Sequence, residues 1–188
     1  MSAEILSSTV DHPRNIRFYG EDEGEEILYI FRRSFVTNVG WILMAIFMLI
    51  APLGFNLFFY FLDTNITALL TPSIVFSVNA FWYLFTFGFI YERFLNWYFN
   101  VYIVTGKRIV DMDFYHLLST RVSEAPLRNI EDVTYRQTGV LESVFNIGSI
   151  FIQTAAENRE FEFDSVANPA KVHDILTDLV REVKGYGR

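Results

Sequence analysis

Two long runs without a charged residue dominate the pattern of polar and apolar positions, one over residues 34–62 and one over residues 64–91. Neither run keeps the polar stripe at a period of 3.6 residues that is typical of a surface helix in a soluble protein. About 20 apolar residues cross the roughly 30 Å hydrocarbon core of a bilayer, so each run is long enough for one crossing. We therefore predict a two-helix transmembrane hairpin over residues 34–95, with spans at about 36–61 and 72–94.

Two kinds of residue interrupt these spans. Pro52 and Gly54 lie inside the first one and are expected to kink it, which a membrane helix tolerates when a neighbour satisfies the carbonyl that proline leaves free. Asn56 and Asn79 are amides well inside the spans. We expect an interhelical hydrogen bond between them, worth about 1 kcal/mol, rather than a role in transport.

The basic residues beside the spans predict the orientation of the hairpin. Arg32 and Arg33 precede the first span and Arg93 follows the second, whereas the link contains Asp63 and no Lys or Arg. By the positive-inside rule, both termini lie in the cytoplasm and the chain is a multi-pass protein of the cytoplasmic (inner) membrane. Residues 1–26 hold seven acids and no apolar segment, which predicts a polar acidic tail and not a cleavable signal.

Beyond the second span, the pattern changes to segments that are typical of β-strands, with two-residue alternation or with enrichment in β-branched and aromatic residues. Turn residues separate six such segments, at residues 98–104, 108–114, 117–125, 129–137, 149–155 and 160–166. The juxtamembrane segment 27–33 fits a seventh strand, and fits the start of the first helix nearly as well. We predict that residues 96–185 form a small, bent antiparallel β-barrel or sandwich in the cytoplasm.

The last predicted element is a helix with clear start and stop signals. Asn168 is a favourable N-cap, Pro169 takes the first helical position, and Gly185 closes the far end. One side of this helix is apolar, with residues at spacings of three and four: Val172, Ile175, Leu176, Leu179, Val180 and Val183. Such a stripe needs an apolar partner, and we expect it to cover the open end of the β-barrel.

Composition narrows the range of functions. Hydrophobic residues make up 52% of the chain and aromatic residues 18%, more than one small water-soluble core would bury. The absence of cysteine excludes disulfides and thiolate metal sites. The net charge of −7 argues against a nucleic-acid partner, because binding phosphates needs a positive face.

Catalytic patterns are missing from the sequence. The three histidines, His12, His116 and His173, are not spaced as a metal-binding pair. No HExxH, GxSxG, Walker or GxGxxG pattern occurs. We therefore expect no enzyme activity, no cofactor and no metal site.

Four strings resemble, in order and spacing, the bacterial pleckstrin-homology-like (PH-like) domain: YIVTGKRIV at 102–110, EAPLRNIEDV at 124–133, GVLESVFNIGSIFIQTA at 139–155 and NPAKVHDIL at 168–176. Members of this family, long described as a domain of unknown function, typically place a transmembrane hairpin before a strand that ends in Tyr-x-Val/Leu-Thr-x-x-Arg. The resemblance covers roughly residues 96–182. It implies a PH-like, strongly bent β-sheet of seven strands closed by one C-terminal helix, in a domain not known as an enzyme.

The family motif falls on Tyr102, Thr105 and Arg108, and then on Pro126, Leu127, Ile130, Gly148, Asn168 and Pro169. We interpret these positions as mainly structural, with the Thr-Gly pair at 105–106 forming a tight turn. Gly139 and Gly148 bracket a short apolar turn, where we expect glycine to provide backbone freedom and the apolar residues to pack. Lys107 and Arg108 lie at the first hairpin, which in phosphoinositide-binding relatives supplies cations to phosphates, so both are candidate lipid-binding or partner-binding residues.

Three functions agree with these features. The favoured one is a membrane-anchored, non-catalytic PH-like binding or scaffold module that docks unidentified protein partners at the inner membrane. The first alternative is a sensor of anionic lipid head groups that uses the first β-hairpin. The further alternative is a structural subunit whose transmembrane hairpins form a homo-oligomer.

Overall fold

The computed structural model of the chain describes residues 8–13, 18, 20, 22, 24–62, 71–115, 119–155 and 160–185. It divides the chain into two compact units. One unit is a helical hairpin, Asn38–Asn96. The other combines Met1–Thr37 with Trp97–Arg188, so the hairpin is inserted within the sequence of a β-domain.

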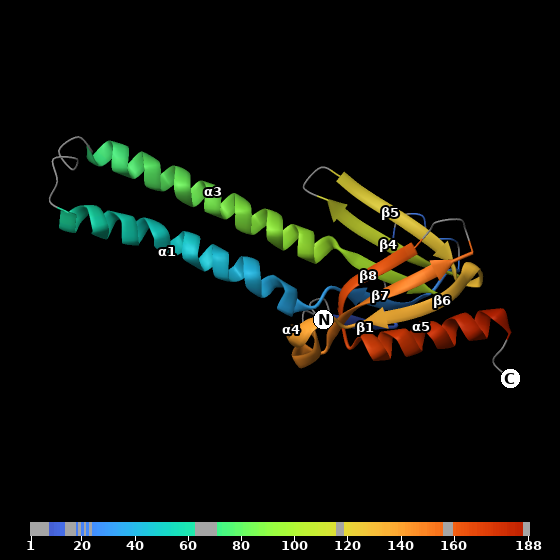
Figure 1. Cartoon of the computed structure of the whole chain (residues 1–188). Coiled ribbons are helices and arrows are strands. Elements are labelled where there is room, and N and C mark those ends of the chain that lie inside the picture. The colour runs from blue at the N-terminus through green and yellow to red at the C-terminus, as the bar shows by residue number, and fades with distance from the viewer. Residues whose placement is uncertain are drawn as a thin grey trace. The chain divides into compact units, whose positions relative to one another are not determined.

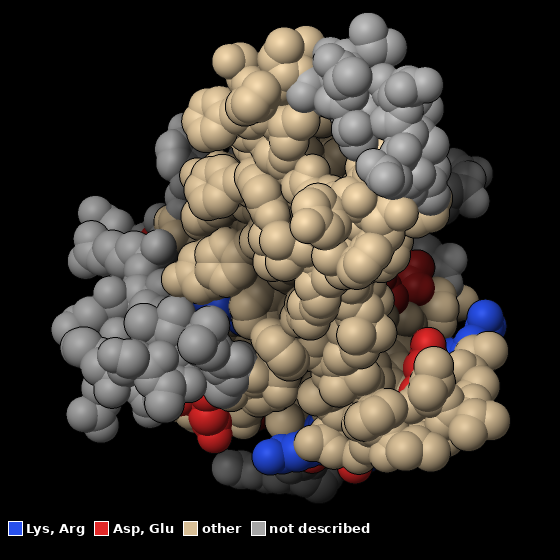
Figure 2. Space-filling view, turned by 90° about the vertical axis from the view of Figure 1, so that its left-hand side faces the viewer, with Lys and Arg blue, Asp and Glu red and all other residues tan. Residues whose placement is uncertain are grey.

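The hairpin consists of helices α1 (Val39–Leu62) and α3 (Pro72–Phe99), which run side by side in opposite directions (Figure 1). A short 3₁₀ helix, η1 (Phe35–Asn38), precedes α1. Both spans are long and apolar enough to cross a membrane, with mean hydropathy of 2.3 over Phe35–Phe61 and 1.6 over Pro72–Phe99. Only 17% and 6% of these apolar windows are buried, which is the opposite of a core helix in a soluble protein. Figure 2 views the protein from the left-hand side of Figure 1 and shows a broad surface without charged residues at its centre, with charged residues toward its edges.

The β-domain contains two antiparallel sheets (Figure 1). The first has five strands in sequence order: β1 (Thr9–Asp11), β2 (Ile27–Arg32), β3 (Val101–Thr105), β4 (Arg108–Tyr115) and β5 (Ser119–Pro126). The second has three: β6 (Ile130–Arg136), β7 (Ile147–Thr154) and β8 (Glu160–Ala167). All seven predicted strands are confirmed, and residues 27–32 are a strand and not the start of a helix.

One strand of the first sheet was not predicted from the sequence. Strand β1 lies within residues 1–26, which the sequence predicts to be a polar acidic tail, and it pairs with β2. An isolated bridge between Arg33 and Val166 joins the two sheets, and closure into one continuous barrel stays a prediction. The shared core is clear, since Tyr102 from β3 stacks on Phe163 from β8 with ring centroids 4.3 Å apart.

Helix α5 (Pro169–Lys184) covers the second sheet, where it lies against β6, β7 and the 3₁₀ helix η2 (Leu127–Asn129). The predicted apolar stripe is confirmed, because Val172, Leu176 and Val180 are buried and the other three residues pack against the same core. Gly185 ends the helix with φ of 75°, a conformation that favours glycine. Lys184 Nζ also donates a hydrogen bond to the carbonyl of Ile130 at 2.5 Å.

Asn168 and Gly148 act differently from the expectation. Asn168 occupies the N-cap position, but it has φ of 51° and its side chain makes no capping bond. Its amide oxygen instead accepts a hydrogen bond from Asn146 Nδ2. Gly148 is needed for space rather than for backbone freedom, because a Cβ atom there would lie 2.6 Å from the carbonyl oxygen of Arg136 and 3.0 Å from Pro169 Cγ. Positive φ occurs at the other bracketing glycine, Gly139.

Candidate functional site

The turn between β3 and β4, which the sequence analysis calls the first hairpin, is organised around Glu25. No motif in the sequence marks Glu25. Arg108 Nε and Nη2 donate to the two carboxylate oxygens of Glu25 at 3.1 and 2.8 Å, which is the two-pronged geometry that favours arginine. Thr105 Oγ1 lies 2.6 Å from Glu25 Oε1. The backbone N–H groups of Lys107 and Arg108 donate to the same hydroxyl at 3.2 and 3.0 Å. The Thr-x-x-Arg motif therefore holds the turn and a buried carboxylate together.

The guanidinium of Arg108 makes three further contacts. Its Nη1 donates to Glu124 Oε2 and its Nη2 to the carbonyl of Gly20, both at 2.6 Å. The group also lies over the ring of Phe18, 5.6 Å from its centroid. Only 18% of the Arg108 side chain is exposed, whereas Lys107 is 56% exposed and its Nζ lies 3.8 Å from Asp22.

The pKa of Glu25 follows from this network. Burial by itself raises the pKa of the carboxyl, but the hydrogen bonds from Arg108, Thr105 and the Asp22 backbone outweigh burial and lower the pKa to about 2. The hydrogen bond that Arg108 donates to Glu25 in turn raises the pKa of Arg108. This ion pair therefore stays charged at every physiological pH, and the two cations of the turn are in contact with three acids, Asp22, Glu25 and Glu124.

Most of the other motif positions are buried, whereas Pro126 and Asn168 are exposed. Tyr102 is 1% exposed, and its hydroxyl accepts a hydrogen bond from the backbone N–H of Asp164 at 2.9 Å. Burial raises the pKa of Tyr102 to about 12. Pro126 ends β5 and leads into η2, where Leu127 and the following Ile130 are fully buried. Pro169 is also buried, at the first turn of α5.

Helix α4 (Gly139–Phe145), between β6 and β7, is the apolar segment that the sequence predicts to pack. The structure contradicts that prediction, because α4 has no buried residue. Four large apolar side chains are instead 52–77% exposed: Val140, Leu141, Val144 and Phe145. The carboxylate of Glu142 does not cover these apolar side chains. It accepts a hydrogen bond from the backbone N–H of Thr138 at 2.6 Å, at the start of the helix.

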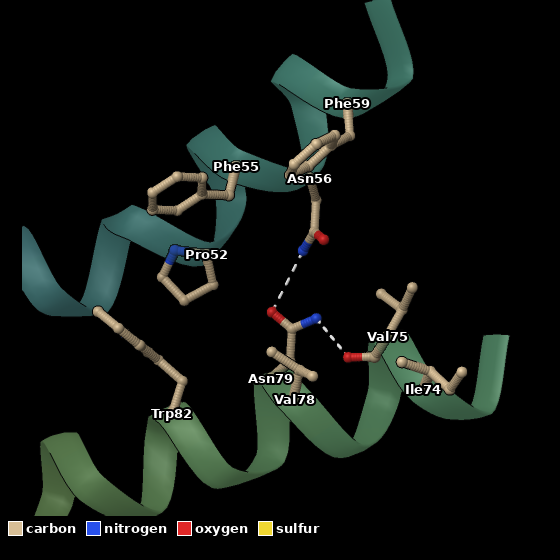
Figure 3. Close-up of a pocket in the computed structure, with 9 residues that line it drawn as sticks. All are labelled: Pro52, Phe55, Asn56, Phe59, Ile74, Val75, Val78, Asn79 and Trp82. Atoms are coloured by element: carbon tan, nitrogen blue, oxygen red, sulfur yellow. Dashed lines mark hydrogen bonds between the residues drawn. The ribbon is translucent and has the colours of Figure 1, made fainter. Parts of the chain in front are cut away.

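A second site lies within the hairpin, where α1 and α3 enclose a cavity of about 420 Å³ (Figure 3). Trp82 Nε1 donates to the carbonyl of Met48 at 2.7 Å. Met48 lies four residues before Pro52, so its carbonyl lacks the usual helical donor and Trp82 takes that place. The predicted interhelical bond is also present, from Asn56 Nδ2 to Asn79 Oδ1 at 3.3 Å.

Each of the two described histidines contacts an acid beside it in the sequence. His12 pairs with Asp11 at 2.7 Å and His173 with Asp174 at 3.0 Å. His116 lies outside the described residues. Within the described ranges, no three His, Asp or Glu side chains are close enough to hold a metal ion.

The described residues thus form two long apolar helices, two antiparallel sheets and a C-terminal helix. The sequence model of the Bacterial PH domain family matches residues 27–180, and the chain belongs to this family. The match begins at the first residue of β2, so it includes the hairpin and extends beyond the region of resemblance noted in the sequence. Among solved structures, the chain is similar to a DUF1696 family protein with a pleckstrin-homology domain from Shewanella loihica PV-4. That likeness has 8% identity and a TM-score of 0.36, and covers 43% of this chain and 69% of the other. No curated protein matches the chain.

Proposed function

We propose that this protein is a membrane-anchored, non-catalytic PH-like module that faces the cytoplasm and docks protein partners at the inner membrane. The observation that carries the proposal is the exposure of Val140, Leu141, Val144 and Phe145 on α4, at 77%, 73%, 69% and 52%. Four exposed apolar side chains within seven residues form a compact patch, and such patches on soluble domains mark interaction surfaces. We call these four residues the α4 patch.

The chemistry of the α4 patch favours a protein over a lipid surface. Helices that lie in a membrane interface combine their apolar face with Lys or Arg, which attract anionic head groups. Helix α4 contains Glu142 and neither Lys nor Arg. Protein interfaces instead centre on apolar and aromatic side chains within a polar rim. The expected partner is therefore a protein with an apolar groove that accepts a short helix.

The alternative function, recognition of anionic lipid head groups, depends on Lys107 and Arg108. A phosphate at this turn would have to compete with the buried carboxylate of Glu25 for Arg108, and it would approach Asp22 and Glu124 as well. Breaking a buried ion pair costs about 3–5 kcal/mol when one partner is removed. This cost makes the lipid-sensor function the weaker candidate.

The hairpin would act in this function as an anchor. An anchor in one membrane would raise the effective concentration of the β-domain for any partner in the same membrane. Weak contacts through one short helix are then sufficient for docking. A single-cysteine variant at Val140 tests the orientation, because the natural chain contains no cysteine. An impermeant maleimide should label this cysteine in inverted inner-membrane vesicles and not in intact spheroplasts.

Docking is tested by placing a photocrosslinking amino acid at Val140 or Val144 of the full-length chain in its native membranes. We expect discrete protein adducts at both positions, and none at Glu131, an exposed residue of β6 that serves as the control. The partner identified from these adducts should bind the purified full-length protein in nanodiscs. Leu141→Glu should weaken this binding at least about tenfold, the size expected for an interface hot spot, without lowering the unfolding temperature.

Three results would contradict the proposal. The first is a set of adducts that contain only lipid, which would assign the α4 patch to the membrane surface. The second is equal binding of the purified partner by the wild type and by Leu141→Glu. The third is binding to vesicles with anionic lipid that Lys107→Glu abolishes while Leu141→Glu leaves it unchanged, which would favour the lipid-sensor function.

A further inference from the structure

The amide pair inside the hairpin leaves hydrogen-bonding capacity unused. Asn79 accepts a hydrogen bond from Asn56 and donates its own Nδ2–H to the carbonyl of Val75 at 2.7 Å. Asn56 donates through Nδ2, but no described residue donates to its Oδ1. Ser77 and Thr86 of the same helix, by contrast, each donate to the backbone carbonyl four residues earlier.

An open amide is costly at this depth of a membrane. Asn56 lies six residues before the end of α1, which places it about 9 Å inside the helix end at 1.5 Å per residue. Hydrocarbon offers no hydrogen-bond donor, and an amide without a partner there costs about 2 kcal/mol or more. Polar side chains in membrane spans therefore face other helices and not lipid. Asn56 is exposed in the single chain, so a further polar group is expected to cover it.

The surface beside the amide pair is shaped to receive another helix. The cavity of about 420 Å³ is apolar apart from the two asparagines, and its lining includes Phe55 and Val78, which are 60% and 62% exposed (Figure 3). The bonds from Trp82 to Met48 and from Asn56 to Asn79 join the two helices beside this cavity. We call this surface the hairpin groove.

The occupant must bring both apolar side chains and a hydrogen-bond donor into the hydrocarbon. An acyl chain fills the volume but leaves Asn56 Oδ1 without a donor. An amide is its own complement, because it carries donors and an acceptor in one side chain. A twofold axis that passes close to Asn56 would bring this residue of the two copies together across the interface. A second copy of this chain therefore supplies what the hairpin groove lacks.

We propose that two copies of this protein associate in the membrane through the hairpin groove, with the Asn56 amides hydrogen-bonded across the interface and apolar side chains of each copy filling the groove of the other. This inference does not depend on the α4 patch or on the nature of its partner. It assigns to the hairpin a role in assembly in addition to anchoring.

Disulfide crosslinking tests the interface directly, because every introduced cysteine is the sole cysteine of the chain. Phe55→Cys and Val78→Cys should each form crosslinked dimers when native membranes are oxidised. Leu57→Cys and Leu84→Cys are matched controls, since these residues are 58% and 69% exposed but do not line the cavity. Crosslinking at the control positions, with none at the groove positions, would overturn the proposal.

Energy transfer between labelled full-length copies in liposomes tests the role of the amide. Asn56→Leu should weaken association by about five- to thirty-fold, the range for one or two hydrogen bonds between membrane helices, whereas Asn56→Gln should retain it. Because Asn56→Leu also breaks the bond to Asn79, Asn79→Leu is the second variant and should still associate. The proposal fails if the wild type is monomeric at all protein-to-lipid ratios, or if Asn56→Leu associates as tightly as the wild type. It also fails if the purified monomer carries one tightly held lipid in the groove.

Discussion

Neutralising Glu25 tests how the Thr-x-x-Arg turn stabilises the β-domain. The substitution Glu25→Gln keeps the size of the side chain but removes the charge that faces Arg108. The carboxylate has no exposed surface, so solvent does not screen its interaction with the guanidinium. Loss of the charge therefore leaves a buried cation with a weaker partner, and we expect the domain to be less stable at neutral pH.

The magnitude follows from the pKa of Glu25. Folding lowers this pKa from 4.5 to about 2, and each unit corresponds to about 1.4 kcal/mol, which gives about 3 kcal/mol of stabilisation. Because the folded-state pKa is the lower one, the stabilisation is complete above pH 4.5 and disappears as the pH falls from 4.5 to about 2. For a domain of this size, about 3 kcal/mol corresponds to a decrease of about 10 °C in unfolding temperature.

The assay is thermal unfolding of the full-length protein in nanodiscs, followed by near-ultraviolet circular dichroism between pH 3 and pH 8. Glu25→Gln should unfold about 10 °C lower than the wild type at pH 7, and the two curves should converge toward pH 3. Glu26→Gln is the matched control, since Glu26 is the exposed neighbour in sequence. Equal unfolding temperatures of Glu25→Gln and the wild type at pH 7, or a constant difference down to pH 3, would refute the reasoning.

Three further substitutions have definite expected outcomes in the same unfolding assay. Gly148→Ala places a Cβ atom 2.6 Å from a backbone carbonyl and should cost about 1–3 kcal/mol, whereas Gly106→Ala, with nothing within 4 Å, should cost less than half as much. Tyr102→Phe leaves the N–H of Asp164 without a partner and should cost about 1–3 kcal/mol. Folding raises the pKa of Tyr102 from 10 to about 12, so the contribution of this phenol to stability is complete below pH 10 and is lost as the pH rises to about 12. An ultraviolet titration should show a late-titrating tyrosine that Tyr102→Phe removes. Trp82→Phe removes the hydrogen bond to the carbonyl of Met48 and should lower the free energy of unfolding by about 1 kcal/mol. An unfolding temperature equal to that of the wild type would contradict this role of the indole N–H.

Local patterns were sufficient to predict most of the fold. Each of the seven predicted strands shows either alternation of apolar and polar residues or enrichment in β-branched and aromatic residues. Helix α5 carries its apolar stripe and its closing glycine in one stretch of sequence. Strand β1 was missed because Thr9–Asp11 is short and lies in an acidic tail, and only pairing with β2 makes it a strand. Pairing between distant segments is not visible in the local pattern.

The candidate site was harder to predict for the same reason. Arg108 was identified from the motif, but its partner Glu25 lies 83 residues earlier, in a tail with seven acids. No sequence feature distinguishes Glu25 from the other acids of the tail. The α4 residues have the apolar composition of a core segment, and only the surrounding fold shows that no other element covers them. The freed carbonyl before Pro52 was expected to find a neighbour, but no pattern in the sequence indicates that Trp82 is that neighbour.

The place of β2 in the first sheet has a consequence for how the protein is made. This strand lies between β1 and β3, and its Phe31 is completely buried, yet the ribosome synthesises it before the hairpin and synthesises β3 after it. The sheet therefore cannot form completely until both apolar helices and β3 have been synthesised. Trp97 Nε1 then donates to the carbonyl of Arg33 at 3.1 Å, joining the two ends of the interrupted domain. A recombinant fragment that starts after the hairpin would lack β2, so the soluble form worth expressing is one that joins residue 37 directly to residue 97 through a short linker.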